Sequence, residues 1–189
     1  MIVTVRELTP EMQDAYLSFF EHEAFADHED WSACYCLESR LKKAEEEACS
    51  GKEMRREKAR ELVRNGVMRG YLLFDGEKAV GWCNTDDKAA YAPIQENSQY
   101  RTGQDGVGKI KAIYCMLLAP AYRGKGLAGL ALDRICEDAK REGYTYVEAY
   151  PFSDRNFPWQ YHGPAALYEK HGFACVQENP GFRILRKKL

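Results

Sequence analysis

One stretch in the second half of the chain limits the possible folds of the protein more than any other part of the sequence. Residues 112–119 are an uncharged apolar run with the length of a strand, and residues 123–126, Arg-Gly-Lys-Gly, follow as a loop. Apolar side chains then recur on one helical face over residues 127–143, and the composition of residues 144–150 predicts a second strand. Strands joined by a helix of this size ordinarily lie parallel, because the right-handed crossover is the usual connection. The chain therefore contains a strand–loop–helix–strand unit.

The loop that begins this helix has the chemistry of a phosphate site. The first N–H groups of a helix have no intrahelical acceptor and point toward any ligand placed there. Gly124 and Gly126 allow a ligand to approach the backbone closely, and Arg123 and Lys125 supply two positive charges beside it. We expect a phosphorylated cofactor to dock at this loop.

Two other phosphate-binding motifs fit these residues less well. The pattern G-x-G-x-x-G of dinucleotide-binding folds is present, with Glu148 at about the distance expected for a ribose-binding acid. A Rossmann turn begins at the end of its strand, however, whereas residues 120–123 intervene here, and too few residues follow Tyr150 for the remaining units. A P-loop needs Ser or Thr after its lysine, and Lys125 precedes Gly126.

Composition limits the classes of partner. The chain has 189 residues, 45% of them hydrophobic, which suffices for one domain with its own core. A formal net charge of -2 gives no overall basic field for nucleic acid or anionic lipid. No stretch approaches the roughly 20 apolar residues of a membrane span, and the first residues lack the pattern of a secretory signal. Seven cysteines without regular spacing indicate reduced thiols. We expect a cytoplasmic protein with a small partner, no nucleic acid and no membrane.

Local patterns predict further strands and helices around this unit. These are a strand at 2–8, a helix from residue 10 to about 23, helical segments within 37–63, a hairpin over 71–83, a short helix over 164–170 and a closing hairpin over 173–185. Residues 84–108 show no clear period, so we expect a long connection of the kind that is functional or mobile.

Two segments together resemble the GNAT superfamily of acyl-CoA-dependent N-acyltransferases. Residues 120–128, Pro-Ala-Tyr-Arg-Gly-Lys-Gly-Leu-Ala, look like the acyl-CoA loop of that family. Residues 166–173, Ala-Leu-Tyr-Glu-Lys-His-Gly-Phe, look like its C-terminal helix and turn. The Cys-x-Cys, Gly-Trp-Cys and Glu-x-Tyr-Pro segments are similar to a bacterial subset of the family. The order of predicted elements agrees with the family across nearly the whole chain.

The resemblance implies an α+β fold with α/β/α layers. Its central sheet is mixed and mostly antiparallel, helices cover both faces, and the fourth and fifth strands form a parallel pair that splays apart. Residues 1–189 would then form a single domain, with a helical elaboration at about 24–65.

The resemblance also implies that acetyl-CoA is the co-substrate, that coenzyme A occupies the phosphate loop, and that no metal takes part. Backbone groups of Met116 and Leu118 would pair with the pantetheine arm and hold the thioester carbonyl. Amides of the loop and the first helical turn would hold the pyrophosphate, and the residues that supply them are Arg123, Gly124, Lys125, Gly126, Leu127 and Ala128.

Two side chains carry catalytic expectations from the same resemblance. Tyr168 would protonate or hydrogen-bond the departing thiolate, since a phenol is neutral at pH 7 and can donate one proton. Glu148 would be the general base, acting directly or through water, because a carboxyl in an apolar strand can have a raised pKa. The alternatives are that Tyr168 only packs its helix against the sheet, and that Glu148 faces solvent or pairs with a cation.

Two positions depart from the family pattern. Ala121 stands where many members carry Gln or Arg, which removes one polar contact to the cofactor. Tyr161 stands near the place of the Asn often found before the C-terminal helix, so the positioning of coenzyme A near its thiol falls to Tyr161 or His162.

Cysteines and aromatic residues suggest other sites only weakly. Cys34 and Cys36 have no matching second pair for zinc, so buried or cavity-lining thiols explain them better. Trp31, Trp82 and Trp159 could line an aromatic acceptor pocket, although such residues more often belong to a core.

The leading expectation is an enzyme that moves an acetyl group from acetyl-CoA to a primary amine in a small molecule or a peptide. The rival is a catalytically silent acyl-CoA-binding sensor or scaffold that uses the same loop. The presence of both Tyr168 and Glu148 favours chemistry, because a binder needs neither. Acceptor specificity would come from the variable segments 24–64 and 84–108, and the oligomeric state is open, a homodimer included.

Overall fold

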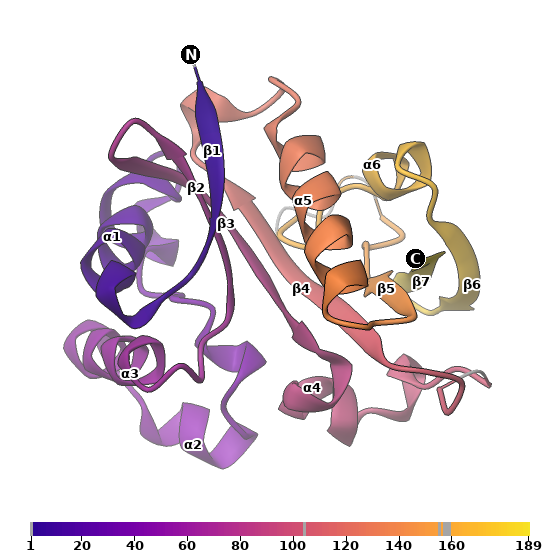
Figure 1. Ribbon diagram of the computed structural model, residues 1–189. Coiled ribbons are helices and arrows are strands. Elements are labelled where there is room, and N and C mark those ends of the chain that lie inside the picture. Colours follow the sequence, from indigo (N-terminus) through magenta and orange to yellow (C-terminus); the bar gives the residue numbers. More distant parts are fainter. Residues whose placement is uncertain (1, 104, 155, 157–159) are drawn as a thin grey trace.

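The computed structural model describes residues 2–103, 105–154, 156 and 160–189 (Figure 1). The strands in this part of the chain are β1 Val3–Glu7, β2 Gly70–Asp75, β3 Lys78–Asp87, β4 Ile110–Leu118, β5 Tyr146–Ala149, β6 Ala174–Asn179 and β7 Phe182–Lys188. The α-helices are α1 Gln13–Ser18, α2 Lys43–Ala48, α3 Lys52–Arg64, α4 Ala92–Glu96, α5 Leu127–Arg141 and α6 Ala165–Lys170. A π-helical turn, Phe19–Glu23, extends α1 to the end predicted from the sequence.

The strands form one mixed sheet in the order β1-β2-β3-β4-β5-β7-β6. β4 and β5 are parallel, and the other neighbouring pairs are antiparallel. α5 makes the crossover between the two parallel strands, as the apolar run and the glycine-rich loop predict (Figure 1). The expected α+β fold with its parallel fourth and fifth strands is confirmed.

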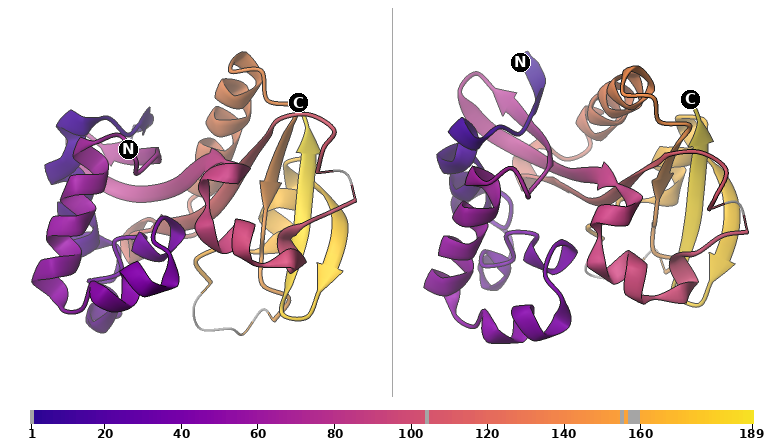
Figure 2. Two further views of the ribbon diagram at one scale, coloured as in Figure 1. Left: turned by 90° about the horizontal axis from the view of Figure 1, so that it is seen from below. Right: turned by 60° about the horizontal axis from the view of Figure 1, so that its bottom comes forward.

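Helices cover both faces of the sheet because strand side chains alternate between them. In β2, Leu72 and Phe74 pack into the core shared with α1 and α3, whereas Tyr71 and Leu73 pack toward α5. α5 lies on the opposite side of the strands from α3 and α4 (Figure 2). The central strands β2, β3 and β4 are therefore buried on both faces of the sheet.

β4 contains a bulge next to the point where it leaves β5. Its pairing with β3 skips Tyr114, because Asn84 lies opposite Cys115 while the next residue of β3 lies opposite Ile113. The extra residue places both Tyr114 and Cys115 in the core on the α1 side of the sheet. Pairing with β5 ends at Ile113 and Ala149, so the two parallel strands diverge after the bulge.

The connection after β3 is more ordered than its sequence suggests. β3 continues to Asp87, and α4 follows within the segment expected to be irregular. The polar end of β3 is buried because Arg40 spans it: Nη1 lies 2.8 Å from Asp86 Oδ2, and Nη2 donates to Asn84 Oδ1 at 3.3 Å. Local periodicity carries no information about a partner 46 residues away. The expectation of a long connection starting at residue 84 is therefore wrong for its first part.

Candidate active site

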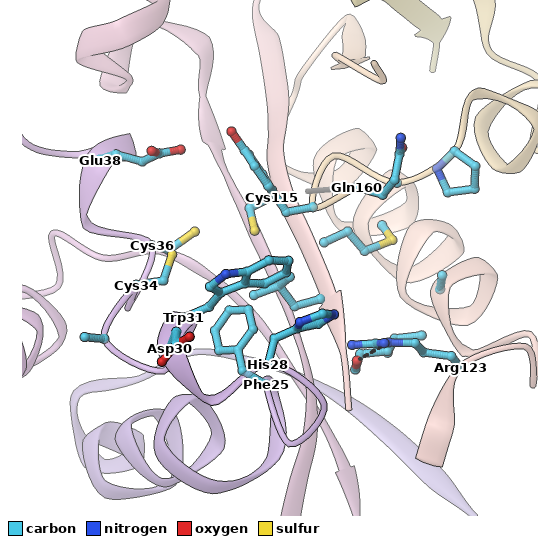
Figure 3. Close-up of a pocket in the computed structure, with 18 of the residues that line it drawn as sticks. Phe25, His28, Asp30, Trp31, Cys34, Cys36, Glu38, Cys115, Arg123 and Gln160 are labelled. Atoms are coloured by element: carbon cyan, nitrogen blue, oxygen red, sulfur yellow. Dashed lines mark hydrogen bonds between the residues drawn. The ribbon is translucent and has the colours of Figure 1, made fainter. Parts of the chain in front are cut away.

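A cavity of about 880 Å³ lies where β4 separates from β5. One wall consists of the end of β4, the loop and start of α5, and the segment 160–167. The facing wall comes from the segment 25–38, which lies between the π-helical turn and α2 (Figure 3). The cavity thus joins the predicted phosphate loop to part of the variable segment in which we expected acceptor specificity.

The start of α5 forms an anion-binding end of this cavity. Gly124 and Gly126 have φ values of 71° and 79°, in the left-handed region that glycine adopts most readily. A Cβ on either residue would meet nothing within 4 Å, so the space around the loop is open. Gly126 is the N-cap of α5 and has no side chain to occupy the first turn, which leaves the N–H groups of Leu127 and Ala128 available to an anion.

Both predicted cations flank the loop. Arg123 lines the cavity, with Nη1 2.5 Å from Asp27 Oδ2 and Nε donating to Leu118 O at 3.1 Å. Lys125 Nζ lies 5.3 Å from the ring centre of Tyr122. The Arg123–Asp27 pair is half exposed, and such pairs contribute about 0–1 kcal/mol. Arg123 can therefore exchange Asp27 for a phosphate at little cost.

The free edge of β4 presents backbone groups to the gap beside β5. Ala119 N–H donates to Val80 O at 3.0 Å, which makes these two a hydrogen-bonded pair of the β3–β4 ladder. In an antiparallel ladder such pairs alternate with pairs whose N–H and C=O groups point outward, so Met116 and Leu118 direct theirs away from β3. The two residues predicted to hold pantetheine thus have the required orientation.

Part of this edge is already engaged by the segment before α6. Met116 N–H donates to Tyr161 O at 2.6 Å, and His162 Nδ1 lies 2.5 Å from Tyr114 O. Burial lowers the pKa of His162 to about 4, so its imidazole is neutral at pH 7 and donates to this carbonyl. A thioester carbonyl held by Met116 would have to replace Tyr161, whereas no described residue bonds to Leu118 N–H on this side of β4.

Tyr168 lies directly behind the cavity wall. Its side chain is fully buried in the core below α5, and its hydroxyl donates to His162 O at 2.6 Å. A Cβ on Gly163, which lines the cavity, would lie 3.2 Å from the Tyr168 oxygen. Burial raises the pKa of Tyr168 well above 10, so the phenol keeps its proton. The hydroxyl therefore lies behind Gly163 and outside the residues that line the cavity.

Glu148 lies outside the cavity lining, in a buried network of charges. Its Oε2 lies 2.9 Å from Lys88 Nζ and accepts a hydrogen bond from the Tyr150 hydroxyl at 2.9 Å. Its Oε1 accepts a hydrogen bond from Arg186 Nε at 2.7 Å. Asp105 bridges the two cations from the far side, 3.0 Å from Lys88 and 2.9 Å from Arg186. This arrangement favours the alternative in which Glu148 pairs with cations, and its role as base stays an untested prediction.

Glu38 is the carboxylate that the cavity itself presents, and the sequence reasoning missed it. It lines the wall opposite β4, and burial, followed by the charge of Glu46, raises its pKa against the lowering effect of Arg55. Burial, followed by the negative charge of Glu38, raises the pKa of Tyr114 and of Tyr161. No residue of the described part of the chain hydrogen-bonds to the Glu38 carboxylate. The only signal in the sequence was an acid two residues beyond a Cys-x-Cys segment.

Aromatic side chains form the rest of the wall opposite β4. Trp31 and His28 stack with ring centres 4.2 Å apart, and Phe25 packs on Trp31 edge to face. All three line the cavity, so Trp31 follows the alternative in which a tryptophan lines a pocket rather than the core reading that was favoured (Figure 3). Trp82 is instead fully buried beneath it, and Trp159 lies outside the described residues.

No group of three or more His, Cys, Asp or Glu side chains in the described part of the chain could hold a metal ion. No helix there is both long enough and apolar enough to cross a membrane.

The chain matches the sequence model of the Acetyltransferase (GNAT) family over residues 6–173. No protein of curated function matches it in sequence. Among solved structures it is similar to the PaiA N-acetyltransferase of Thermoplasma acidophilum in complex with coenzyme A, with 13% identity and a TM-score of 0.59 over 100% of both chains. It is also similar to the polyamine N-acetyltransferase of Drosophila melanogaster, with 11% identity and a TM-score of 0.60 over 100% of both chains. An acetyltransferase from Thermus thermophilus has 16% identity and a TM-score of 0.58, over 100% of this chain and 98% of that one.

Proposed function

The chain belongs to the acetyltransferase (GNAT) family, and on that premise we propose that it transfers an acetyl group from acetyl-CoA directly to the nitrogen of a primary amine. The observation that carries this proposal is the continuity of the cavity. One space runs from the glycine loop of α5, along the outward-facing edge of β4, to a partly buried carboxylate on the opposite wall. Those are the parts that binding a thioester and deprotonating an amine require.

Each end of the cavity suits one reactant. The diphosphate of coenzyme A would bind to the amides of Leu127 and Ala128 with Arg123 and Lys125 beside it. The pantetheine arm would lie along the Leu118 end of the β4 edge. The acceptor would enter between the aromatic wall and Glu38, where a cationic ammonium group meets a negative charge and apolar rings.

In the chemistry that follows, the nitrogen must lose two protons and the departing thiolate must gain one. Glu38 would take a proton from the acceptor ammonium, directly or through one water, and its raised pKa makes it a better base than an ordinary glutamate. The neutral amine attacks the thioester carbonyl, and the C–S bond to coenzyme A breaks. Tyr168 would give its proton to the departing thiolate across Gly163, and the second proton that the nitrogen loses after its attack would return to Tyr168 through water. Glu148 enters this proposal only as the charge that holds Lys88 and Arg186 in place.

A small amine or a peptide N-terminus is the acceptor class that this geometry supports. Among similar structures, one is a polyamine N-acetyltransferase, and another is a NatC complex bound to a Gag peptide and coenzyme A. The aromatic wall with Glu38 accommodates either kind of cation.

The rival function, a silent acyl-CoA sensor, has one observation in its favour. Met116 N–H is engaged by Tyr161, so the backbone donor nearest the expected thioester is not free. A sensor would bind the cofactor beside this closed donor and release no thiol.

The deciding experiment combines binding with turnover. Calorimetry with acetyl-CoA tests the loop, and release of free thiol is then followed over a panel of diamines, amino acids and short peptides. We expect acceptor-dependent thiol release that Glu38→Gln lowers by roughly 10²–10⁴-fold while acetyl-CoA binding is retained. Binding without release for any amine would favour the sensor, and absence of binding would refute both functions.

A further inference from the structure

A fully buried asparagine from the sheet connects to the segment that carries Glu38. Asn84 belongs to β3, and its side chain is closed off from solvent. It lies outside the residues that line the cavity, so it contacts neither reactant of the proposed transfer. A buried amide is retained only where its hydrogen bonds are satisfied, and the partners of Asn84 show what it does.

The amide of Asn84 is bonded through both its oxygen and its nitrogen. Oδ1 accepts hydrogen bonds from the Tyr91 hydroxyl at 2.9 Å and from Arg40 Nη2 at 3.3 Å. Nδ2 donates to the Ser39 hydroxyl oxygen at 2.8 Å. Because donors surround the oxygen and an acceptor faces the nitrogen, the amide has one satisfied orientation. Asn84 therefore holds Ser39 at a defined place relative to β3.

The fully buried hydroxyl of Ser39 extends this contact to the turn before it. It donates its single hydrogen to Cys36 O at 2.6 Å, so toward Asn84 it acts as the acceptor. The Ser39 N–H donates to the same carbonyl at 3.3 Å. Successive hydrogen bonds polarise and strengthen one another in a dry interior. A chain of buried hydrogen bonds thus runs from β3 through Ser39 to the carbonyl of Cys36.

The turn needs this support because its backbone is strained. Tyr35 and Cys36 have φ values of 44° and 52°, so two successive residues other than glycine are left-handed. Such conformations persist only where the surrounding structure holds them. The Tyr16 hydroxyl holds Tyr35 O at 2.6 Å, and the Ser39 hydroxyl holds Cys36 O at the same distance. Loss of either bond would let the turn relax.

The strained turn determines the direction of Glu38. Residues Leu37–Ser39 form a single 3-10 turn directly after it. Leu37 and Ser39 are both fully buried, and with three residues per turn the residue between them projects away from their side. Glu38 accordingly lines the cavity, and its carboxylate points from this wall toward β4 (Figure 3). A shift of the turn would move the carboxylate with it.

We propose that Asn84 is a positioning residue for the acetyl transfer: through the Ser39 hydroxyl it fixes the turn that directs Glu38 to the acceptor amine. The proposal rests on the function proposed above, in which Glu38 takes a proton from the acceptor ammonium. Asn84 moves no proton itself. A base must lie within hydrogen-bond reach of the proton that it removes, directly or through one water. A misplacement of about 1 Å can lower a rate on the order of 10²-fold.

Two variants of the full chain break the hydrogen-bond chain at different places. Asn84→Ala removes the donor to Ser39, and Ser39→Ala removes the donor to Cys36 O while Tyr91 and Arg40 keep their acceptor. Both variants should bind acetyl-CoA in calorimetry as the unaltered chain does, because neither residue lines the cavity. We expect kcat/KM for the amine, measured by thiol release per folded molecule, to fall by roughly 10- to 100-fold. Ser39→Ala carries the test where Asn84→Ala does not fold.

The pH profile separates positioning from a simple loss of stability. Burial is the main reason why the pKa of Glu38 is raised, with Glu46 raising it further and Arg55 lowering it. A relaxed turn exposes the carboxylate to water while both neighbours remain, so the acidic limb of kcat/KM should move to lower pH. The control Tyr71→Phe removes a buried hydrogen bond of 2.9 Å to Asp138 beside α5. It should lower the unfolding free energy but leave the acidic limb and kcat/KM unchanged.

A double variant shows whether the network acts through Glu38. In the Glu38→Gln background, Ser39→Ala should lower thiol release by less than about twofold more, because no base is left to position. Full kcat/KM in both network variants, an unmoved acidic limb, or a loss that multiplies with that of Glu38→Gln would overturn the positioning role and leave acetyl transfer intact. Full turnover by Glu38→Gln, or no thiol release by the unaltered chain, would instead remove the proposed function, and the positioning role with it.

Discussion

The variant Glu148→Gln should have a lower free energy of unfolding but should still turn over its substrates. The carboxylate is fully buried, and its partners Arg186 and Lys88 are only 4% and 8% exposed. Glu148→Gln removes one negative charge from a cluster of two anions and two cations, so one cation is left buried without a full counter-charge. Removing one partner of a buried pair costs about 3–5 kcal/mol.

Asp105, the anion that remains in the variant, determines where in this range the loss of unfolding free energy should fall. Asp105 contacts both cations and keeps part of the compensation, so we expect the lower end, about 3 kcal/mol. With a urea m-value of about 2 kcal/mol/M, the midpoint of unfolding should move down by roughly 1.5 M. The double variant Glu148→Gln with Arg186→Met should recover much of this loss, because it removes the uncompensated charge as well.

Urea unfolding and thiol-release turnover, measured on the same samples, show whether Glu148 supports the fold or acts as the base. Turnover per folded molecule should stay within a few fold of the unaltered chain. A change in unfolding free energy below about 1 kcal/mol together with a loss of turnover of 10²-fold or more would refute this reasoning and establish Glu148 as the base.

Three further outcomes follow from single residues. Gly126 has a left-handed backbone, so Gly126→Ala should weaken acetyl-CoA binding in calorimetry by roughly 5- to 30-fold, which corresponds to about 1–2 kcal/mol of backbone strain. The control Gly76→Ala, in the β2–β3 turn, introduces similar strain and should leave acetyl-CoA binding unchanged. Arg55→Gln removes a charge that lowers the pKa of Glu38, so the acidic limb of the kcat/KM profile should move to higher pH, and an unmoved limb would exclude Glu38 as the base. The pKa of His162 is about 4 in the folded protein and 6.5 for an ordinary histidine. Its neutral form therefore contributes at most about 3 kcal/mol of stability above pH 6.5, and this contribution is lost as the pH falls toward 4. His162→Gln should flatten this part of a plot of unfolding free energy in urea against pH.

The sequence predicts those parts of the molecule that depend on neighbours along the chain. The apolar run of β4, the glycine loop and the apolar face of α5 carry their structure in local composition, and the loop residues Gly124 and Gly126 lie as expected. The hairpin of β2 and β3 follows in the same way from alternation and its Asp75-Gly76 turn. The local sequence pattern was sufficient to predict those features that depend on a single strand, loop or helix.

Residues fixed by distant partners were not predictable in this way. Glu38 reaches the cavity because a strained turn and the Arg40–Asp86 pair, 46 residues apart, hold its segment against β3. Glu148 has partners 38 residues away at Arg186 and 60 residues away at Lys88, and periodicity reports neither. The environment of both carboxylates is set by tertiary contacts, so the sequence could indicate acidic residues as candidates but could not show which of them is the base.

The bulge in β4 adds one residue without changing how the strand pairs on either side of it. Removing Tyr114 would leave Ile113 opposite Thr85 and Cys115 opposite Asn84, so the side chains before and after the bulge would keep their faces of the sheet. The deletion would instead remove the bend that a bulge introduces, next to the point where β4 leaves β5. We expect a straightened β4 to follow β5 further and to narrow the gap between the two strands, although every lining residue would keep its side.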